Sequence, residues 1–138
     1  MADISLGTGA EEVPLAGMLA DMLKANLEKP EKLKDFNKLK SRVLIHAEDA
    51  DAKITMDFDR GKLVVYGGEV GKPDISIATD STTLLDLANI KIKFGLPWYF
   101  DETGLGVVKK LLTRKLKIKG LITRLPALTR LTKVMSLN

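Results

Sequence analysis

Few side chains in this 138-residue chain have the types and spacing that bond-breaking chemistry requires. The single histidine, His46, lies in the run RVLIHAE, whose composition is typical of a strand. A general base needs a nucleophile and an orienting partner within hydrogen-bond distance, and the sequence offers no convincing set of the three. We therefore interpret His46 as an ordinary strand residue and expect no catalytic residues and no enzymatic activity.

The acidic and glycine-rich segments are candidates for cation binding and for phosphate binding. Asp57 and Asp59 lie on the same face of a predicted strand and could together bind a cation weakly. They lack the glycine and closing glutamate of a calcium loop, which favours a solvated turn. Gly67, Gly68 and Gly71 do not match the spacing of a phosphate-binding loop. We expect no metal ion and no cofactor.

Composition is that of one globular domain. Apolar residues make up 45% of the chain and charged residues 29%, and there is no cysteine. The missing cysteine excludes disulfides and thiol nucleophiles. The N-terminus does not resemble a secretory signal, and no run of apolar residues is long enough for a membrane span. We predict a cytoplasmic protein, with a flexible leader at residues 1–12 and a single domain at residues 13–138.

The spacing of apolar residues predicts helices first and a sheet afterwards. Between Pro14 and Pro30, a stripe that includes Met18 and Leu23 recurs every three or four residues, as in a helix. Residues 42–79 contain β-rich runs separated by turn signals, and Gly61 suits a hairpin turn. A helix capped by Asp80 follows. This segregation of helices from strands predicts an α+β fold.

The last third of the chain is basic and rich in leucine. Residues 103–138 hold nine Lys and Arg and no acidic residue, whereas residues 1–102 hold 13 basic and 18 acidic residues. The pattern predicts a helix at residues 106–114, an alternating strand at residues 115–119 and a leucine-rich helix after Gly120. The cations suit the solvated faces of these elements, but could also attract anionic lipid, an acidic protein or nucleic acid.

Three runs of sequence resemble the sterol carrier protein type two family. The closing run LLTRKLKIKGLITRLPALTRL is similar to the family's C-terminal signature, and its KLKIKG core is residues 115–120. ITMDFDRGKLVVYGG and DISIATDSTTLLDLAN resemble its strand–turn–strand and its next strand and capped helix, so the likeness covers about residues 15–138. Two features depart from the family: Arg114 replaces a usual glycine, and residues 89–104 are longer and more aromatic.

The resemblance implies a curved, mostly antiparallel five-stranded sheet covered on one face by helices, with an apolar tunnel between them. Proteins of this family bind fatty acids, fatty acyl-CoA, sterols or phospholipids. We accordingly expect non-catalytic binding or transfer of such a lipid. Besides the lipid, we expect the protein to make transient contact with an anionic membrane surface. We expect no nucleic acid, because the basic residues are interleaved with leucine and not with exposed aromatic or base-reading side chains.

Pattern and resemblance together indicate the side chains of the tunnel. The expected lipid-binding residues are Leu84, Leu87, Ala88, Phe94, Leu96, Trp98, Phe100, Val108, Leu112, Ile118, Leu125, Leu128, Leu131 and Met135. The cations expected to contact a head group or a membrane are Lys109, Lys110 and Arg114.

A protein-interaction module is the alternative function. Its interior would be filled by its own side chains, and the apolar segment around Trp98 would dock a protein partner or a second copy of the chain, forming a homodimer. An internal void of several hundred Å3 favours lipid binding, and a packed interior beside an exposed apolar patch favours the interaction module.

Overall fold

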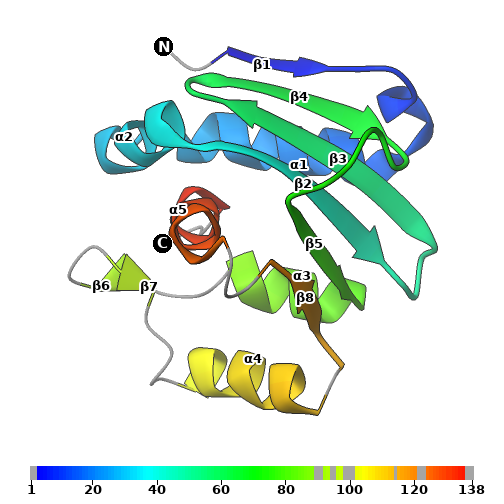
Figure 1. Ribbon diagram of the computed structural model, residues 1–138, viewed down its shortest axis with the longest axis vertical. Helices are drawn as coiled ribbons and strands as arrows, with labels where there is room; N and C mark the ends of the chain where they lie inside the picture. Colours follow the sequence, from blue (N-terminus) through cyan, green and yellow to red (C-terminus); the bar gives the residue numbers. More distant parts are fainter. Residues whose placement is uncertain are drawn as a thin grey trace.

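The computed structural model describes residues 3–88, 92–93, 96–97, 102–113, 115–120 and 124–135. In this part of the chain, helices cover one face of a sheet, and α4 lies at the periphery (Figure 1). The elements in chain order are β1 (Asp3–Leu6), the 3-10 helix η1 (Ala10–Glu12), α1 (Pro14–Asn26), α2 (Pro30–Lys38), β2 (Lys40–Ala47), β3 (Ala52–Asp59), β4 (Lys62–Gly67), β5 (Ile75–Thr79), α3 (Ser81–Ala88), β6 (Ile92–Lys93), β7 (Leu96–Pro97), α4 (Glu102–Leu112), β8 (Lys117–Lys119) and α5 (Leu125–Met135).

The main sheet is mixed and has six strands within the described residues, in the order β1-β4-β3-β2-β5-β8. Its β2–β3, β3–β4 and β5–β8 pairs are antiparallel, whereas β1–β4 and β2–β5 are parallel. The α+β class is confirmed, but the expected five-stranded sheet is corrected to a mixed sheet of six strands. β6 and β7 form a separate two-stranded sheet.

The strand that the sequence did not predict is β1, which lies within residues 1–12. It pairs in parallel with residues 62–65 and so covers an edge of β4 that would otherwise present unpaired backbone groups. The contact continues past the strand, where the Gly7 N–H donates to the Val65 carbonyl at 2.7 Å. Gly67 then passes so close to the backbone of Gly9 that a side chain there would collide with the Gly9 carbonyl. A run of four residues carries too little periodicity to predict this pairing.

Alternating burial shows which face of the sheet carries the core. Ile54, Met56 and Phe58 of β3 are all at most 1% exposed, as their period of two predicts. From the helical layer, Phe36 of α2 meets Phe58 edge-on, with ring centroids 6.1 Å apart and an interplanar angle of 76°. The predicted hairpin between β3 and β4 is also confirmed, with Gly61 at φ 97°.

The first helix turns most of the predicted stripe inward, with Leu15 and Leu19 packed against the core, but not Met18. Leu23 is fully buried as expected, but Met18 is 65% exposed. The upstream half of α1 instead buries Ala16 and Ala20, which are 0% and 2% exposed. Alanine lets the helix backbone approach the sheet closely, and such a contact is decided by the neighbouring layer and not by the helix's own periodicity.

The C-terminal turn of α5 is held by polar side chains of α1 and α2. Buried Asn26 donates from Nδ2 to the Val134 carbonyl at 3.1 Å, and buried Lys32 donates from Nζ to the Lys133 carbonyl at 2.7 Å. Asp35 Oδ2 also lies 2.9 Å from Lys133 Nζ. The last carbonyls of a helix have no partner within the helix. These two donors therefore satisfy the end of α5 inside the protein.

Replacing Asn26 by Ala should lower the free energy of unfolding by about 1–3 kcal/mol, because the Val134 carbonyl would lose its buried donor. Urea unfolding followed by circular dichroism measures this change. Asn37→Ala, at an exposed position of α2, is the matched control and should change stability by less than about 0.5 kcal/mol. Equal losses in the two variants would show that the contact with α5 is unimportant.

Lys32 should also make stability depend on pH. Burial lowers its pKa below the ordinary value of 10.5 and the Lys29 charge lowers it further, against the opposing effects of Glu31 and Asp35. Between the lowered pKa and 10.5, the unfolded chain binds more protons than the folded chain, so this lysine makes the free energy of unfolding rise with pH. Urea unfolding at a series of pH values should show that the rise is lost in Lys32→Met. Parallel pH profiles of the two proteins would contradict it.

Candidate functional site

Several of the expected tunnel residues meet in one apolar cluster beneath the helices. Leu128 and Leu131 of α5 are 8% and 1% exposed. Leu84 of α3, Ile118 of β8 and Met135 of α5 are partly buried and pack against the same cluster. The fold therefore brings together three elements that are separated by up to about fifty residues in the sequence. The cluster is the hydrophobic core of the described chain, and the part of it to which α3, β8 and α5 contribute is the candidate site.

The sequence interpretation missed Val134, which is 0% exposed and belongs to the same cluster. It lies three residues after Leu131, so helical spacing was a signal that could have found it. Leu116, placed just before β8, is likewise 1% exposed and part of the cluster.

Helix α4 presents a different face to the interior from the one predicted. Val107 is 5% exposed and Leu111 packs against the core, whereas Val108 is half-buried and Leu112 is 78% exposed. In this structure Leu112 therefore does not line the interior. The sequence contains both pairs at the same spacing of four residues, and the helix is rotated by one residue, about 100°, from the predicted orientation.

Other expected site residues cannot be placed in the cluster. Phe94, Trp98, Phe100 and Arg114 lie outside the described residues. For Leu87, Ala88, Leu96 and Leu125, only the backbone is described, in α3, β7 and α5.

The two expected head-group lysines of α4 have different surroundings. Lys109 is exposed, whereas Lys110 is half-buried and its Nζ donates to Thr83 Oγ1 of α3 at 3.0 Å. Asp80 accepts a hydrogen bond from the Thr83 backbone N–H at 2.7 Å, which confirms the predicted helix cap. Hydrogen bonding to Thr83 lowers the pKa of the Asp80 carboxyl, and the charges of Lys110 and Lys115 lower it further. Lys110 is thus part of a polar contact that joins α3 to α4.

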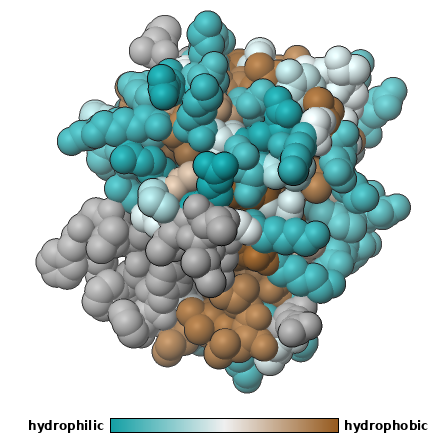
Figure 2. All heavy atoms as spheres, in the orientation of Figure 1, coloured by the Kyte–Doolittle hydropathy of each residue, from teal (hydrophilic) through white to brown (hydrophobic). Residues whose placement is uncertain are grey.

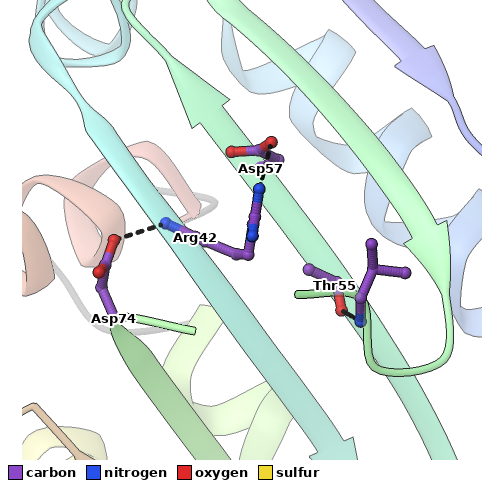
Figure 3. Close-up of polar contacts among 5 residues, drawn as sticks. Arg42, Thr55, Asp57 and Asp74 are labelled. Carbon is purple, nitrogen blue, oxygen red and sulfur yellow. Dashed lines mark hydrogen bonds and ion pairs between the residues drawn. The ribbon is translucent and has the colours of Figure 1, made fainter. Parts of the chain in front are cut away.

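A hollow of about 400 Å3 lies on the other, solvent-facing side of the sheet. Figure 3 shows its central contacts: Arg42 Nη2 lies 3.4 Å from Asp57 Oδ2, and Asp74 Oδ2 accepts from the Arg42 backbone N–H at 3.1 Å. Cationic and acidic side chains balance one another in its walls, so this hollow does not suit an apolar ligand. The lining residues are Lys40, Ser41, Arg42, Asp57, Phe58, Asp59, Lys72 and Asp74.

The outer face of the sheet is not uniformly exposed to solvent, and Thr55 of β3 is the exception. Its side chain is 1% exposed because the segment after β4 folds over it. Thr55 Oγ1 donates to the Gly68 carbonyl at 2.8 Å. It also accepts from the Val70 N–H at 2.9 Å, the contact drawn in Figure 3. These bonds fix the start of the connection between β4 and β5.

The described residues offer little for catalysis. His46 is half-buried, and its Nε2 lies 3.8 Å from Asp51 Oδ1 with no hydrogen-bond partner. Within the described ranges, no cluster of three or more His, Asp or Glu side chains could hold a metal ion. A search of the same ranges finds no helix with the length and apolar character to cross a membrane.

Comparison with protein families matches residues 19–133 to the SCP-2 sterol transfer family. A search of curated proteins found no match. Among solved structures, the UbiJ-SCP2 ubiquinone synthesis protein is similar over 88% of each chain, with a TM-score of 0.61 and 12% identity. Sterol carrier protein 2 from Yarrowia lipolytica, in its apo form, has a TM-score of 0.53 at 18% identity, over 86% of this chain and 89% of that one. Another crystal structure of sterol carrier protein 2 has a TM-score of 0.53 at 14% identity, over 86% and 91%. At these identities the structural likeness is one of fold.

Substitution of the neighbouring residues Lys109 and Lys110 tests the polar contact between α3 and α4. Lys110→Ala should lower the free energy of unfolding by about 1 kcal/mol, because the buried Thr83 hydroxyl loses one of its two hydrogen-bond partners and keeps Asp80. Lys109→Ala, at the exposed position beside it, should change stability by less than about 0.5 kcal/mol. Thermal and urea unfolding of both variants measure the difference. Equal effects would mean that the contact between α3 and α4 contributes nothing.

Proposed function

The chain belongs to the SCP-2 sterol transfer family, and on that premise we propose that it binds an apolar lipid and transfers it without catalysing a reaction. The proposed ligands are a fatty acid, a fatty acyl-CoA, a sterol or a phospholipid. The family match over most of the chain is the observation that carries this proposal. Because a protein of ubiquinone synthesis has the same fold, ubiquinone and its precursors are added to the lipids to be sought.

The proposed binding site is the apolar cluster between the sheet and helices α3 and α5. Leu84, Ile118 and Met135 are partly buried and pack against this core, and in the proposal the remaining apolar surface of each contacts the ligand. Each Å2 of apolar surface that a lipid removes from water contributes about 25 cal/mol. Methionine is flexible and polarisable, which suits a wall that adapts to different chains. Leu128 and Leu131 would form the floor beneath the ligand.

We also propose the remaining expected lipid-binding residues, on the basis of the sequence pattern and the family resemblance. They are Leu87, Ala88, Phe94, Leu96, Trp98, Phe100 and Leu125. Lys109 and Arg114 remain the proposed head-group contacts. Lys110 can take that role only by exchanging its hydrogen bond with Thr83 for one with the ligand. The cytoplasmic location likewise stays a prediction.

Organic extraction of the purified protein, followed by mass spectrometry, tests the proposal. We expect a co-purifying lipid, and uptake of a fluorescent fatty acid by the delipidated protein. Leu84→Trp should fill part of the site and weaken fatty-acid binding about tenfold, or about 1.4 kcal/mol. Met18→Trp introduces the same side chain at a position 65% exposed on α1 and should leave binding unchanged. The absence of both co-purifying lipid and fatty-acid uptake would refute lipid binding.

Dimerisation through an interaction surface remains the second candidate. Its expected surface is the apolar segment around Trp98, which lies outside the described residues. Sedimentation velocity measurements over a range of protein concentrations would reveal a dimer.

A further inference from the structure

The outward face of α4 carries an apolar stripe. Leu105 is 54% exposed and Leu112 is 78% exposed, and half-buried Val108 lies between them at helical spacing. Figure 2 shows apolar atoms gathered at the bottom of the view, where Figure 1 places α4. The other large exposed apolar side chains of the described residues, Leu6 and Met18, lie on separate elements. Scattered apolar side chains are usual on protein surfaces, but a row of three along one helix is a patch.

This stripe does not stabilise the helix against the core. The opposite face of α4, with Val107 and Leu111, packs inward, and the helix is tied to α3 by the bond from Lys110 to Thr83. Truncating Leu105 or Leu112 should therefore leave the fold intact. Any role of these exposed side chains must therefore come from a binding partner that covers them.

Positive charge accompanies the stripe. Lys109 is exposed and lies on the same side of α4, between Leu105 and Leu112. Lys115 is exposed and follows directly, because its N–H donates to the Lys110 carbonyl at 2.9 Å. Lys119 of β8 is exposed as well, and residues 103–138 contain no acidic side chain. Exposed Lys109 and Lys115 therefore accompany the C-terminal half of the stripe, whereas exposed Glu102, in the first turn of α4, precedes Leu105.

A second copy of the chain fits this surface poorly. A standard protein–protein interface buries about 800 Å2 on each partner, far more than three aliphatic side chains supply. Two copies meeting through α4 would also bring Lys109 and Lys115 against the same lysines of the other copy, and like charges repel.

We propose that the outward face of α4 docks on the surface of an anionic lipid bilayer. Leu105, Val108 and Leu112 would enter the boundary between head groups and acyl chains, and Lys109 and Lys115 would contact the anionic head groups. A short apolar stripe and a pair of cations each bind a bilayer weakly, and their contributions add when they lie on the same face. This inference rests on the proposed lipid binding, since α4 packs beside α3, whose Leu84 belongs to the candidate site. Docking would bring that site next to the membrane.

Vesicle flotation with the full chain tests the inference. The probes are vesicles of phosphatidylcholine alone and of phosphatidylcholine mixed with phosphatidylglycerol. Wild-type protein should bind the anionic vesicles, lose binding as salt is raised and bind the neutral vesicles weakly. The double variant Leu105→Ser/Leu112→Ser should reduce anionic-vesicle binding at least about tenfold. Leu6→Ser/Met18→Ser, the control for exposed apolar side chains elsewhere, should stay within about twofold of wild type.

The charge is tested separately. Lys109→Glu should weaken binding to the anionic vesicles about tenfold, and the matched reversal Lys24→Glu on α1 should have less than about twofold effect. Undiminished binding by the Leu105/Leu112 variant, or equal binding to both kinds of vesicle, would overturn the inference. So would a wild-type dimer that the Leu105/Leu112 variant converts to a monomer, since the occupant would then be a second copy.

Fatty-acid uptake in solution separates this inference from the proposed function. The Leu105/Leu112 variant should take up fatty acid as the wild type does, because both side chains point away from the candidate site. Wild-type uptake without vesicle binding would refute docking and leave lipid binding intact. Vesicle binding through α4 without lipid uptake would refute the proposed function alone.

Discussion

The end of helix α5 lies inside the protein, and its backbone carbonyls must be satisfied there. Asn26 and Lys32 satisfy the carbonyls of Val134 and Lys133, and Asp35 balances part of the positive charge. Burying a lysine is unfavourable unless it is hydrogen-bonded and near an opposite charge. Asp35 and Glu31 of α2 itself supply the opposite charge, whereas the hydrogen bond to the Lys133 carbonyl forms only when α5 lies against α2. The polar contacts thereby determine where the apolar stripe of α5 rests, and the candidate site depends on that position.

The contacts that hold the helices in place are polar, and the surface that they enclose is apolar. Lys110 and Thr83 join α3 to α4, and Asn26 and Lys32 join the N-terminal helices to α5. Below them, Leu131 and Val134 of α5 are fully buried, whereas Leu84 and Met135 are only partly buried at the edge of the core. The charged hollow on the outer side of the sheet is separated from this interior by the strands themselves.

Local features were predictable because short-range physical chemistry decides them. The turn at Gly61 needs a positive φ, and the first turn of α3 needs an acceptor for free N–H groups, which Asp80 supplies. The alternation of Ile54, Met56 and Phe58 was sufficient to predict the buried face of β3. In contrast, the pairing of β1 with β4 and the parallel pairing of β2 with β5 join distant segments. Nothing in the local pattern of either strand specifies its neighbour.

The sequence by itself determined the α+β class, the caps and turns, the basic C-terminal third and the likeness to a lipid-binding family. It also determined that α4 would be amphipathic, but not which of its faces would be covered. Val107 with Leu111 and Val108 with Leu112 have the same spacing and nearly the same hydrophobicity, so periodicity cannot separate them. Tertiary structure decided between them, and in the observed rotation Lys110 donates to Thr83 of the neighbouring helix. That rotation assigns Val107 to the interior and Leu112 to the surface.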